Sequence, residues 1–182
     1  MRGHSPLGQA VAAIGLCMGR TCWLLARRAV HLPKANVGRP VSFADGSRST
    51  VYRETVLDGS DPRDPCVLVV EFRLRWVRGK GHDIFRRESL LNTPLFVGFP
   101  GFVSKLWLAA DQDGFYRGLY DWSGPERADH YARALWWALI VVSERGSIRY
   151  QVLPGARRDA VLAAPAIADR AAEEAWWRPV AA

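Results

Sequence analysis

Two histidines and a tyrosine are the side chains in this sequence that are best suited to acid–base chemistry. His82 precedes Asp83, and an imidazole next to a carboxylate can act as a general base near neutral pH. Asp83 would equally serve as the N-cap of a helix that begins there, so this pair also has a structural interpretation. His130 follows Trp122 by eight residues in a predicted helix, and Tyr120 offers its hydroxyl group. His82, His130 and Tyr120 are therefore the predicted catalytic residues.

Aromatic side chains that could surround a flat, apolar ligand are frequent in this chain, which has eight tryptophans among 182 residues. Such residues belong to the hydrophobic core by default, but their rings can also line a cavity in which tyrosine hydroxyls orient a ligand. The predicted substrate-binding residues are Phe72, Trp76, Tyr116, Trp122, Tyr131, Trp136 and Tyr150.

Hydrophobic patterns place these side chains on a β-α-β-β-α-β succession between residues 65 and 155. Strands are predicted at 66–77, 102–109, 115–122 and 147–154, and helices at 82–91 and 123–146. Ser123 and Glu126 form a capping-box pattern at the start of the second helix. The succession is that of a ferredoxin-like α+β fold.

Two extensions flank this domain. Residues 1–64 are predicted to hold an amphipathic helix and a short strand pair around Asp45-Gly46, and residues 156–182 a helical tail. An apolar stripe with three- and four-residue spacing marks the first helix: Leu7, Val11, Ile14, Met18, Cys22, Leu25, Ala29 and Leu32. This stripe could dock on the core or on a second subunit. Alternatively, residues 7–32 lie on a membrane surface, with Arg20 and Arg27 facing the lipid headgroups.

Alternation along the strands predicts one apolar sheet face, covered by helices, and one charged face. Leu106 and Leu108 are assigned to the apolar face, and Lys105 and Trp107 to the charged face. The charged face is either exposed to solvent or paired with the same face of a second copy in a C₂ dimer. The helix at 123–146 is apolar almost all round, so the N-terminal helix or Trp176-Trp177 should cover its outer side.

Composition argues against several classes of protein. The net charge is +7, but the arginines alternate with acidic residues instead of forming a basic run, so nucleic-acid binding is not expected. The three cysteines form no Cys-x-x-Cys pair, which argues against a zinc site or a disulfide framework and fits the cytoplasm. Arginines interrupt the apolar N-terminal run, so it predicts neither a spanning helix nor a cleaved signal peptide. Motifs for nucleotide phosphates, a serine nucleophile and a helical metal pair are absent, so no metal is expected.

Three short segments of the domain carry a resemblance to a known family. They read "PGFVSKLW" at 100–107, "GLYDW" at 118–122 and "ADHYARAL" at 128–135. With them, the stretch from Cys66 to Gly155 resembles the dimeric α/β-barrel superfamily, and most closely its YdhR-like mono-oxygenase group. These motifs are structural, so the resemblance bears on the fold more than on the reaction.

The resemblance implies a homodimer whose two sheets form a barrel, with a pocket between sheet and helices in each subunit. Relatives use such pockets for cofactor-free oxygenation of phenolic compounds, for polyketide cyclisation, for isomerisation, or for haem. We therefore expect a cofactor-independent mono-oxygenase or cyclase that acts on a hydrophobic aromatic or polyketide-like molecule. Haem, held near Trp122 and His130, is the alternative cofactor. The alternative function is a non-catalytic module that binds an apolar ligand or a membrane surface, and the sequence leaves open whether the chain is catalytic.

Overall fold

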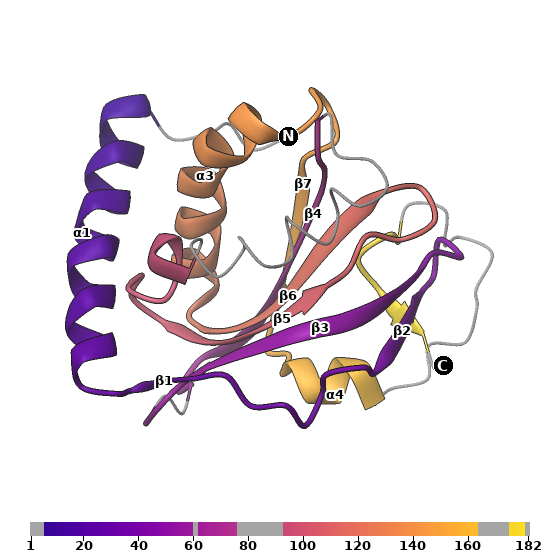
Figure 1. Cartoon of the computed structure of the whole chain (residues 1–182), viewed down its shortest axis with the longest axis horizontal. Helices are drawn as coiled ribbons and strands as arrows, with labels where there is room; N and C mark the ends of the chain where they lie inside the picture. Colours follow the sequence, from indigo (N-terminus) through magenta and orange to yellow (C-terminus); the bar gives the residue numbers. More distant parts are fainter. Residues whose placement is uncertain (1–5, 60–61, 76–92, 164–174, 181–182) are drawn as a thin grey trace.

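The computed structural model describes residues 6–59, 62–75, 93–163 and 175–180. They form an α+β structure around one curled antiparallel sheet (Figure 1). The helices are α1 (Leu7–Ala26), α3 (Pro125–Val142) and α4 (Arg158–Ala163). The strands are β1 (Val30–His31), β2 (Pro40–Phe43), β3 (Arg48–Leu57), β4 (Pro65–Arg73), β5 (Phe102–Leu108), β6 (Phe115–Ser123), β7 (Arg149–Pro154) and β8 (Pro179–Val180).

The centre of the sheet agrees with a ferredoxin-like fold. The order in the sheet is β7-β4-β6-β5-β3-β2-β8, with β1 paired to β3. Its first four strands are those predicted for the domain, and α3 connects β6 to β7 as expected. The helix predicted at 82–91 lies outside the described residues, and so do His82 and Trp76.

The hairpin between β5 and β6 is held by an aspartate in its turn. Asp111 Oδ1 accepts hydrogen bonds from the backbone N–H groups of Asp113, at 3.0 Å, and Phe115, at 2.9 Å. A side chain that bonds the backbone of its own turn in this way favours the reversal of the chain. The turn therefore follows directly from the sequence "DQDG".

The start of α3 differs from the prediction. β6 continues through Ser123, whose backbone N–H still donates to Gly101 O at 2.7 Å. Gly124 is the N-cap instead, with a φ of 100° that favours glycine, and no side chain caps the helix. The capping box predicted from Ser123 and Glu126 is wrong because Ser123 is still part of the strand.

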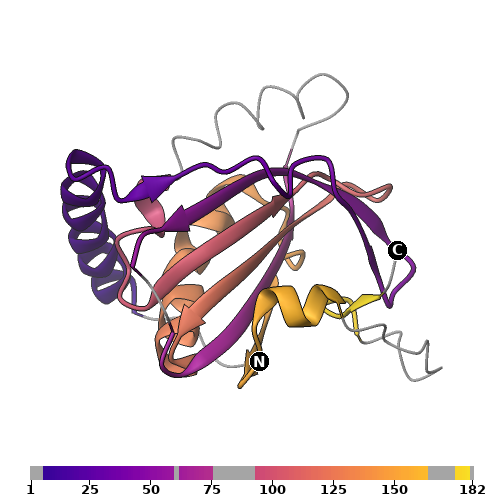
Figure 2. The same cartoon turned by 90° about the horizontal axis from the view of Figure 1, so that it is seen from below.

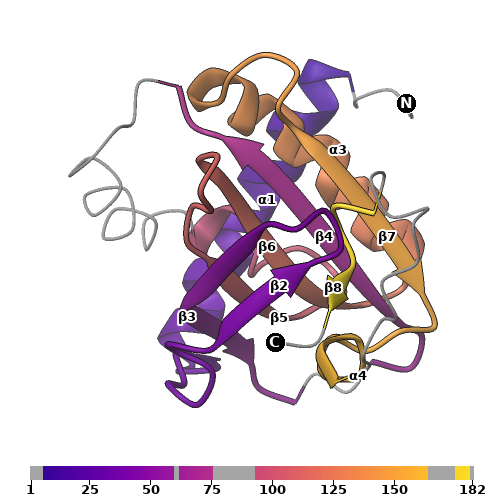
Figure 3. The same cartoon turned by 90° about the vertical axis from the view of Figure 1, so that its right-hand side faces the viewer.

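Residues of the N-terminal extension continue the sheet beyond β5. β3 pairs with β5, for example Thr55 with Lys105, and β2 pairs with β3 across the predicted Asp45-Gly46 turn. β2 and β8 then fold over one face of the sheet, in front of β4 and β6 in Figure 3, with α1 and α3 behind. A second hydrophobic core lies between these layers, and it includes Val41, Phe43, Val67, Leu106, Leu119 and Trp176.

The charged residues of this covered face are paired within one chain. Arg117, which is 3% exposed, contacts Glu71, Asp111 at 2.8 Å and Asp45 at 2.9 Å. Arg158 of α4 contacts Glu54 at 2.9 Å, and its backbone N–H donates to Asp121 Oδ1 at 2.7 Å. The interpretation in which these side chains pair across a dimer is therefore wrong, because the partners lie in the chain's own β3, β4 and α4 and in its β2–β3 and β5–β6 turns.

The face assigned to β5 is also wrong. Leu106 and Leu108 belong to the second core, whereas Lys105 and Trp107 point to the side that α3 covers. Alternation along a strand shows which residues share a face. It does not show which segments of the chain cover that face and bury its side chains. On β5 those segments are β2 and β3, which bury leucines on the side expected to be charged.

The N-terminal helix covers α3, as one of the two alternatives predicted (Figure 1). Trp176, the other candidate, lies on the opposite face of the sheet, over Arg149. The side of α1 that faces the core carries Ala10, Cys17, Thr21 and Leu24. Of the predicted apolar stripe, Ile14 and Ala29 pack against the core, whereas Leu7, Val11, Met18 and Leu25 are exposed. Small residues face inward because α1 passes close to a loop: a Cβ at Gly98 would lie 2.0 Å from Cys17 O.

Candidate active site

The structure brings together three of the predicted site residues, Tyr120, Trp122 and Tyr131. The ring centroids of Trp122 and Tyr131 are 5.0 Å apart, and those of Tyr120 and Tyr131 are 5.6 Å apart. All three side chains are at most 2% exposed. They are packed ring against ring with Phe96, Phe99 and Phe102, as in an ordinary core.

The two tyrosine hydroxyls of this aromatic core share a hydrogen bond of 3.3 Å. Burial raises the pKa of both Tyr120 and Tyr131, because the phenolate form would lose its hydration. Both hydroxyls are therefore protonated at neutral pH. Tyr120 can donate or accept a hydrogen bond, but it is not suited to remove a proton from a ligand.

The remaining described candidates occupy separate positions. His130 is exposed on α3, with its ring centroid 6.3 Å from that of Phe99. The half-buried Tyr150 donates from its hydroxyl to Asp129 Oδ1 at 2.9 Å. Tyr116 stacks on Phe72 with 5.9 Å between ring centroids, and Trp136 is half-buried on α3. His130 is thus a surface residue, while Phe72, Trp136 and Tyr150 pack at the margin of the core.

A lysine that the sequence analysis assigned to the other face lies against the aromatic core. Lys105 Nζ is 3.1 Å from the ring centroid of Trp107 and 4.7 Å from those of Phe96 and Tyr120. The side chain is 6% exposed. In the described part of the chain, its amino group meets aromatic rings and forms no ion pair.

A second cation lies beside this lysine. The Arg53 guanidinium carbon is 5.4 Å from the ring centroid of Trp107 and 5.5 Å from that of Tyr52. A β-bulge between Val51 and Arg53 shifts the register of β3 against β5 at this point, and bulges commonly redirect side chains near functional sites. We call Lys105, Arg53, Tyr52, Phe96, Trp107 and Tyr120 the lysine site.

Burial lowers the pKa of Lys105 well below its ordinary value, and the positive charge of Arg53 lowers this pKa further. The ring faces attract a cation, but they replace only part of the hydration that an ammonium group has in water. Both effects shift the equilibrium of Lys105 toward its neutral form, in which Nζ carries a lone pair. Desolvation and a neighbouring cation are the two features that make lysines nucleophilic or basic in enzymes.

Two neighbours fix the geometry of the lysine site. The Trp107 indole N–H donates to Thr55 Oγ1 at 3.1 Å, which holds the ring under the lysine. Gly118 lies opposite Trp107 on β6, and a Cβ there would come within 2.7 Å of the Tyr120 ring and 3.2 Å of Lys105 Cε. Glycine at this position leaves the space that the Tyr120 and Lys105 side chains fill. The lysine in the apolar run "FVSKLWL", followed by the glycine in the strand sequence "FYRGLYDWS", is the sequence signal that could have indicated the site.

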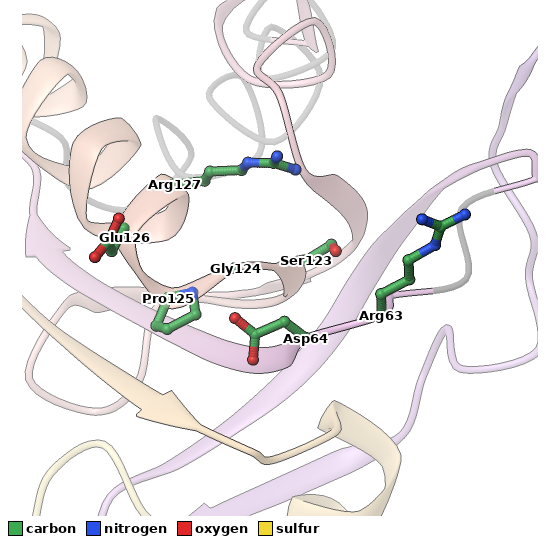
Figure 4. A pocket seen from close by; sticks show the side chains of 7 residues that line it. All are labelled: Arg63, Asp64, Ser123, Gly124, Pro125, Glu126 and Arg127. Atoms are coloured by element: carbon green, nitrogen blue, oxygen red, sulfur yellow. The ribbon is translucent and has the colours of Figure 1, made fainter.

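A surface hollow of about 620 Å³ lies elsewhere, where β6 leads into α3 (Figure 4). Arg63 and Asp64 line it from the segment before β4, and Glu126 and Arg127 from the first turn of α3. Its lining contains no aromatic side chain and none of the predicted site residues. Among the described residues, no group of three or more His, Cys, Asp or Glu side chains could hold a metal ion.

Comparison with known proteins gives weak structural likenesses. No protein-family model and no curated protein matches the sequence. One similar solved structure is an uncharacterised ferredoxin-fold protein from Listeria monocytogenes, related to antibiotic biosynthesis monooxygenases. It shows 14% identity and a TM-score of 0.44, over 62% of this chain and 66% of that chain. An anthrone oxidase-like protein shows 16% identity and a TM-score of 0.41, over 61% and 55%. The matches span less than two thirds of either solved chain, and likenesses this low establish neither family nor function.

Proposed function

We propose that this chain is an enzyme that removes a proton from a hydrophobic aromatic or polyketide-like molecule at the lysine site, as a cofactor-independent mono-oxygenase or cyclase. The observation that carries the proposal is the buried amino group of Lys105 between the rings of Phe96, Trp107 and Tyr120. Flat rings favour a flat, apolar ligand, and the neutral amine supplies the base that the aromatic core lacks.

The shared first step is a proton transfer. The lone pair of Lys105 Nζ takes the proton of a phenolic O–H, or of a C–H next to a carbonyl. The bonding pair remains on the substrate as a phenolate or enolate, and the lysine becomes an ammonium ion. The new ammonium group and Arg53 then face the anion in a site with little water, where their attraction for it is strong.

Two reactions of this anion belong to the proposal. In oxygenation, O₂ is the oxidant: one oxygen atom becomes a carbonyl oxygen at an oxidised CH₂ carbon of the substrate, and the other leaves as water. In cyclisation, the carbanion attacks a carbonyl of the same molecule and Lys105 returns its proton to the alkoxide, with no net oxidation. In both reactions the protein binds, desolvates and deprotonates the substrate.

The YdhR-like grouping, the homodimer and the cytoplasmic location remain part of this proposal. A dimer of this chain would need a surface other than the charged sheet face. That face is covered by β2, β8 and α4 of the same chain, and its core residues include Val67, Leu106 and Trp176.

The activity test uses Lys105→Met, which keeps an unbranched side chain as far as Cε and removes the amine. A panel of anthrone-like phenols and poly-β-ketones is followed by oxygen uptake and by mass spectrometry of the products. We expect the variant to lose about 10²- to 10⁴-fold in kcat, the contribution typical of a positioned base. Lys34→Met, at an exposed lysine, is the matched control and should retain the wild-type rate. A Lys105→Met protein that turns over substrate at the wild-type rate would contradict the assignment.

A further inference from the structure

The outer side of α1 exposes an unusual amount of apolar surface. Six large apolar side chains of this helix are 46% to 78% exposed: Leu7, Val11, Leu16, Met18, Trp23 and Leu25. Figures 1 and 2 show α1 at the edge of the molecule. An exposed patch of this kind on one element marks an interaction surface.

Helical geometry makes these residues one broad face. At 100° per residue, Leu7, Val11, Met18 and Leu25 form one ridge, and Leu16 and Trp23 form another. Gly15 and Gly19 fall between the two ridges, and nothing lies within 4 Å of a Cβ built at either position. The face is opposite Ala10, Cys17 and Thr21, which dock on the core, so both ridges can reach a flat surface together.

The charge around this face has one sign. The first 44 residues contain no aspartate or glutamate. Arg20, Arg27 and Arg28 are exposed along or just after the helix. The guanidinium carbon of Arg27 lies 4.6 Å from the ring centroid of Trp23, which places a cation beside an aromatic ring of the kind enriched at membrane–water interfaces. The complementary surface is therefore anionic and apolar at once.

We infer that the outer face of α1 binds the surface of an anionic lipid membrane, with the helix lying in the plane of the interface. By length and composition α1 could also cross a bilayer. Its inner side is engaged with the domain instead: Thr21 is fully buried, and Cys17 Sγ donates to Pro94 O at 3.1 Å. A helix held in this way presents its apolar face to lipid while its arginines reach the headgroups.

A second copy of the chain fits this face less well. In a contact between two α1 helices, the first 44 residues of the second copy would offer no acidic residue to pair with Arg20 and Arg27. Acidic phospholipid headgroups neutralise such cations, and each arginine near an anionic surface strengthens binding about fivefold.

The test is vesicle flotation of the full chain with phosphatidylcholine vesicles and with vesicles that also contain phosphatidylglycerol. Three variants are compared with the wild type: Val11→Asp/Leu16→Asp, Arg20→Glu, and Arg48→Glu at the distant β2–β3 hairpin. All four substituted residues are exposed, and each variant lowers the net charge by the same amount, so Arg48→Glu controls for charge alone. Circular dichroism verifies that each variant is folded.

We expect the wild type and Arg48→Glu to float with the anionic vesicles and not with the neutral ones. The Val11→Asp/Leu16→Asp and Arg20→Glu variants should bind at least about tenfold more weakly. Absence of vesicle binding by the wild type, or equal loss in all three variants, would overturn the inference. Size exclusion with light scattering measures the oligomeric state of the wild type and of Val11→Asp/Leu16→Asp. A wild type that is dimeric and does not bind vesicles, together with a Val11→Asp/Leu16→Asp variant that is monomeric, would assign the face to a second copy of the chain.

Discussion

At the scale of single residues, Lys105 is the position where chemistry and stability oppose each other. An amine at 6% exposure with no ion pair among the described residues costs stability, because its charged form is better hydrated in the unfolded chain. A close-packed aromatic core would be more stable with an apolar side chain there. Residues that reduce stability in this way are found most often at functional sites.

The first prediction concerns the pH dependence of this cost. The pKa of Lys105 in the folded chain is below its unfolded value of 10.5. Between these two pKa values Lys105 is protonated in the unfolded chain but not in the folded one. Lowering the pH within this range therefore favours the unfolded chain and reduces the free energy of unfolding. Above the unfolded pKa the lysine is neutral in both states, and this cost disappears. Lys105→Met should therefore be more stable than the wild type at neutral pH. The advantage should shrink by about 1.4 kcal/mol per pH unit as pH rises toward 10.5 within that window.

Urea denaturation of both proteins from about pH 6 to about pH 10, below the unfolded pKa of Lys105, measures this difference. Lys34→Met, which changes an exposed lysine, should show no comparable trend. A constant difference between Lys105→Met and the wild type over the whole range would mean that Lys105 is charged in the folded protein.

At the scale of elements, the sequence predicted which segments form strands and helices better than it predicted which side they bury. β4, β5, β6, α3 and β7 all overlap the ranges predicted by the hydrophobic patterns, although α3, at Pro125–Val142, is shorter than the predicted 123–146. The alternation in β5 correctly grouped Lys105 with Trp107, but it could not say which face β2 and β3 would cover. That information lies in contacts between strands about 60 residues apart, and sequence periodicity reports only local pattern.

The side on which α1 docks was missed for a related reason. The apolar stripe is the usual docking face of a helix, yet here the inner residues are small because the backbone of Gly98 approaches the helix. Close approach selects small side chains, which a hydrophobic pattern does not register. The large apolar residues that remained outside are the basis of the membrane inference.

A second prediction tests this close approach. Gly98→Ala would place Cβ 2.0 Å from Cys17 O and 2.8 Å from Thr21 Oγ1, and a backbone carbonyl cannot move without moving α1. We expect a loss of about 1–3 kcal/mol in the free energy of unfolding, together with faster amide hydrogen exchange along α1. Gly15→Ala is the matched control, since a Cβ there meets nothing within 4 Å. Unchanged exchange in α1 of Gly98→Ala would show that the helix does not rest on this loop.

At the scale of the whole molecule, the chain supplies the cover for both faces of its own sheet. Helices α1 and α3 lie on one side, and β2, β8 and α4 on the other (Figure 3). The ion pairs of Arg117 and Arg158 join the sheet to these covering segments within one chain. The candidate site is confined to the side with the helices, and the membrane-binding face proposed for α1 is the outer surface of that same side.

This arrangement also explains how much of the candidate site was predictable. Tyr120, Trp122 and Tyr131 were correctly placed together, because strand and helix periodicity put them on facing surfaces. Their packing into a solid core, the exposure of His130 and the burial of Lys105 depend on how the layers close, which a single sequence does not show.

The account's central claim is that burial lowers the pKa of the Lys105 amine in the folded chain, and side-chain NMR tests it most directly. The chain has three lysines, so ¹³Cε and ¹⁵Nζ signals are few, and the Lys105→Met spectrum identifies the one that belongs to Lys105. We predict that this signal titrates well below 10.5. A Lys105 signal that keeps the chemical shift of an ammonium group up to pH values near 10.5 would contradict the account and remove the base from the proposed mechanism.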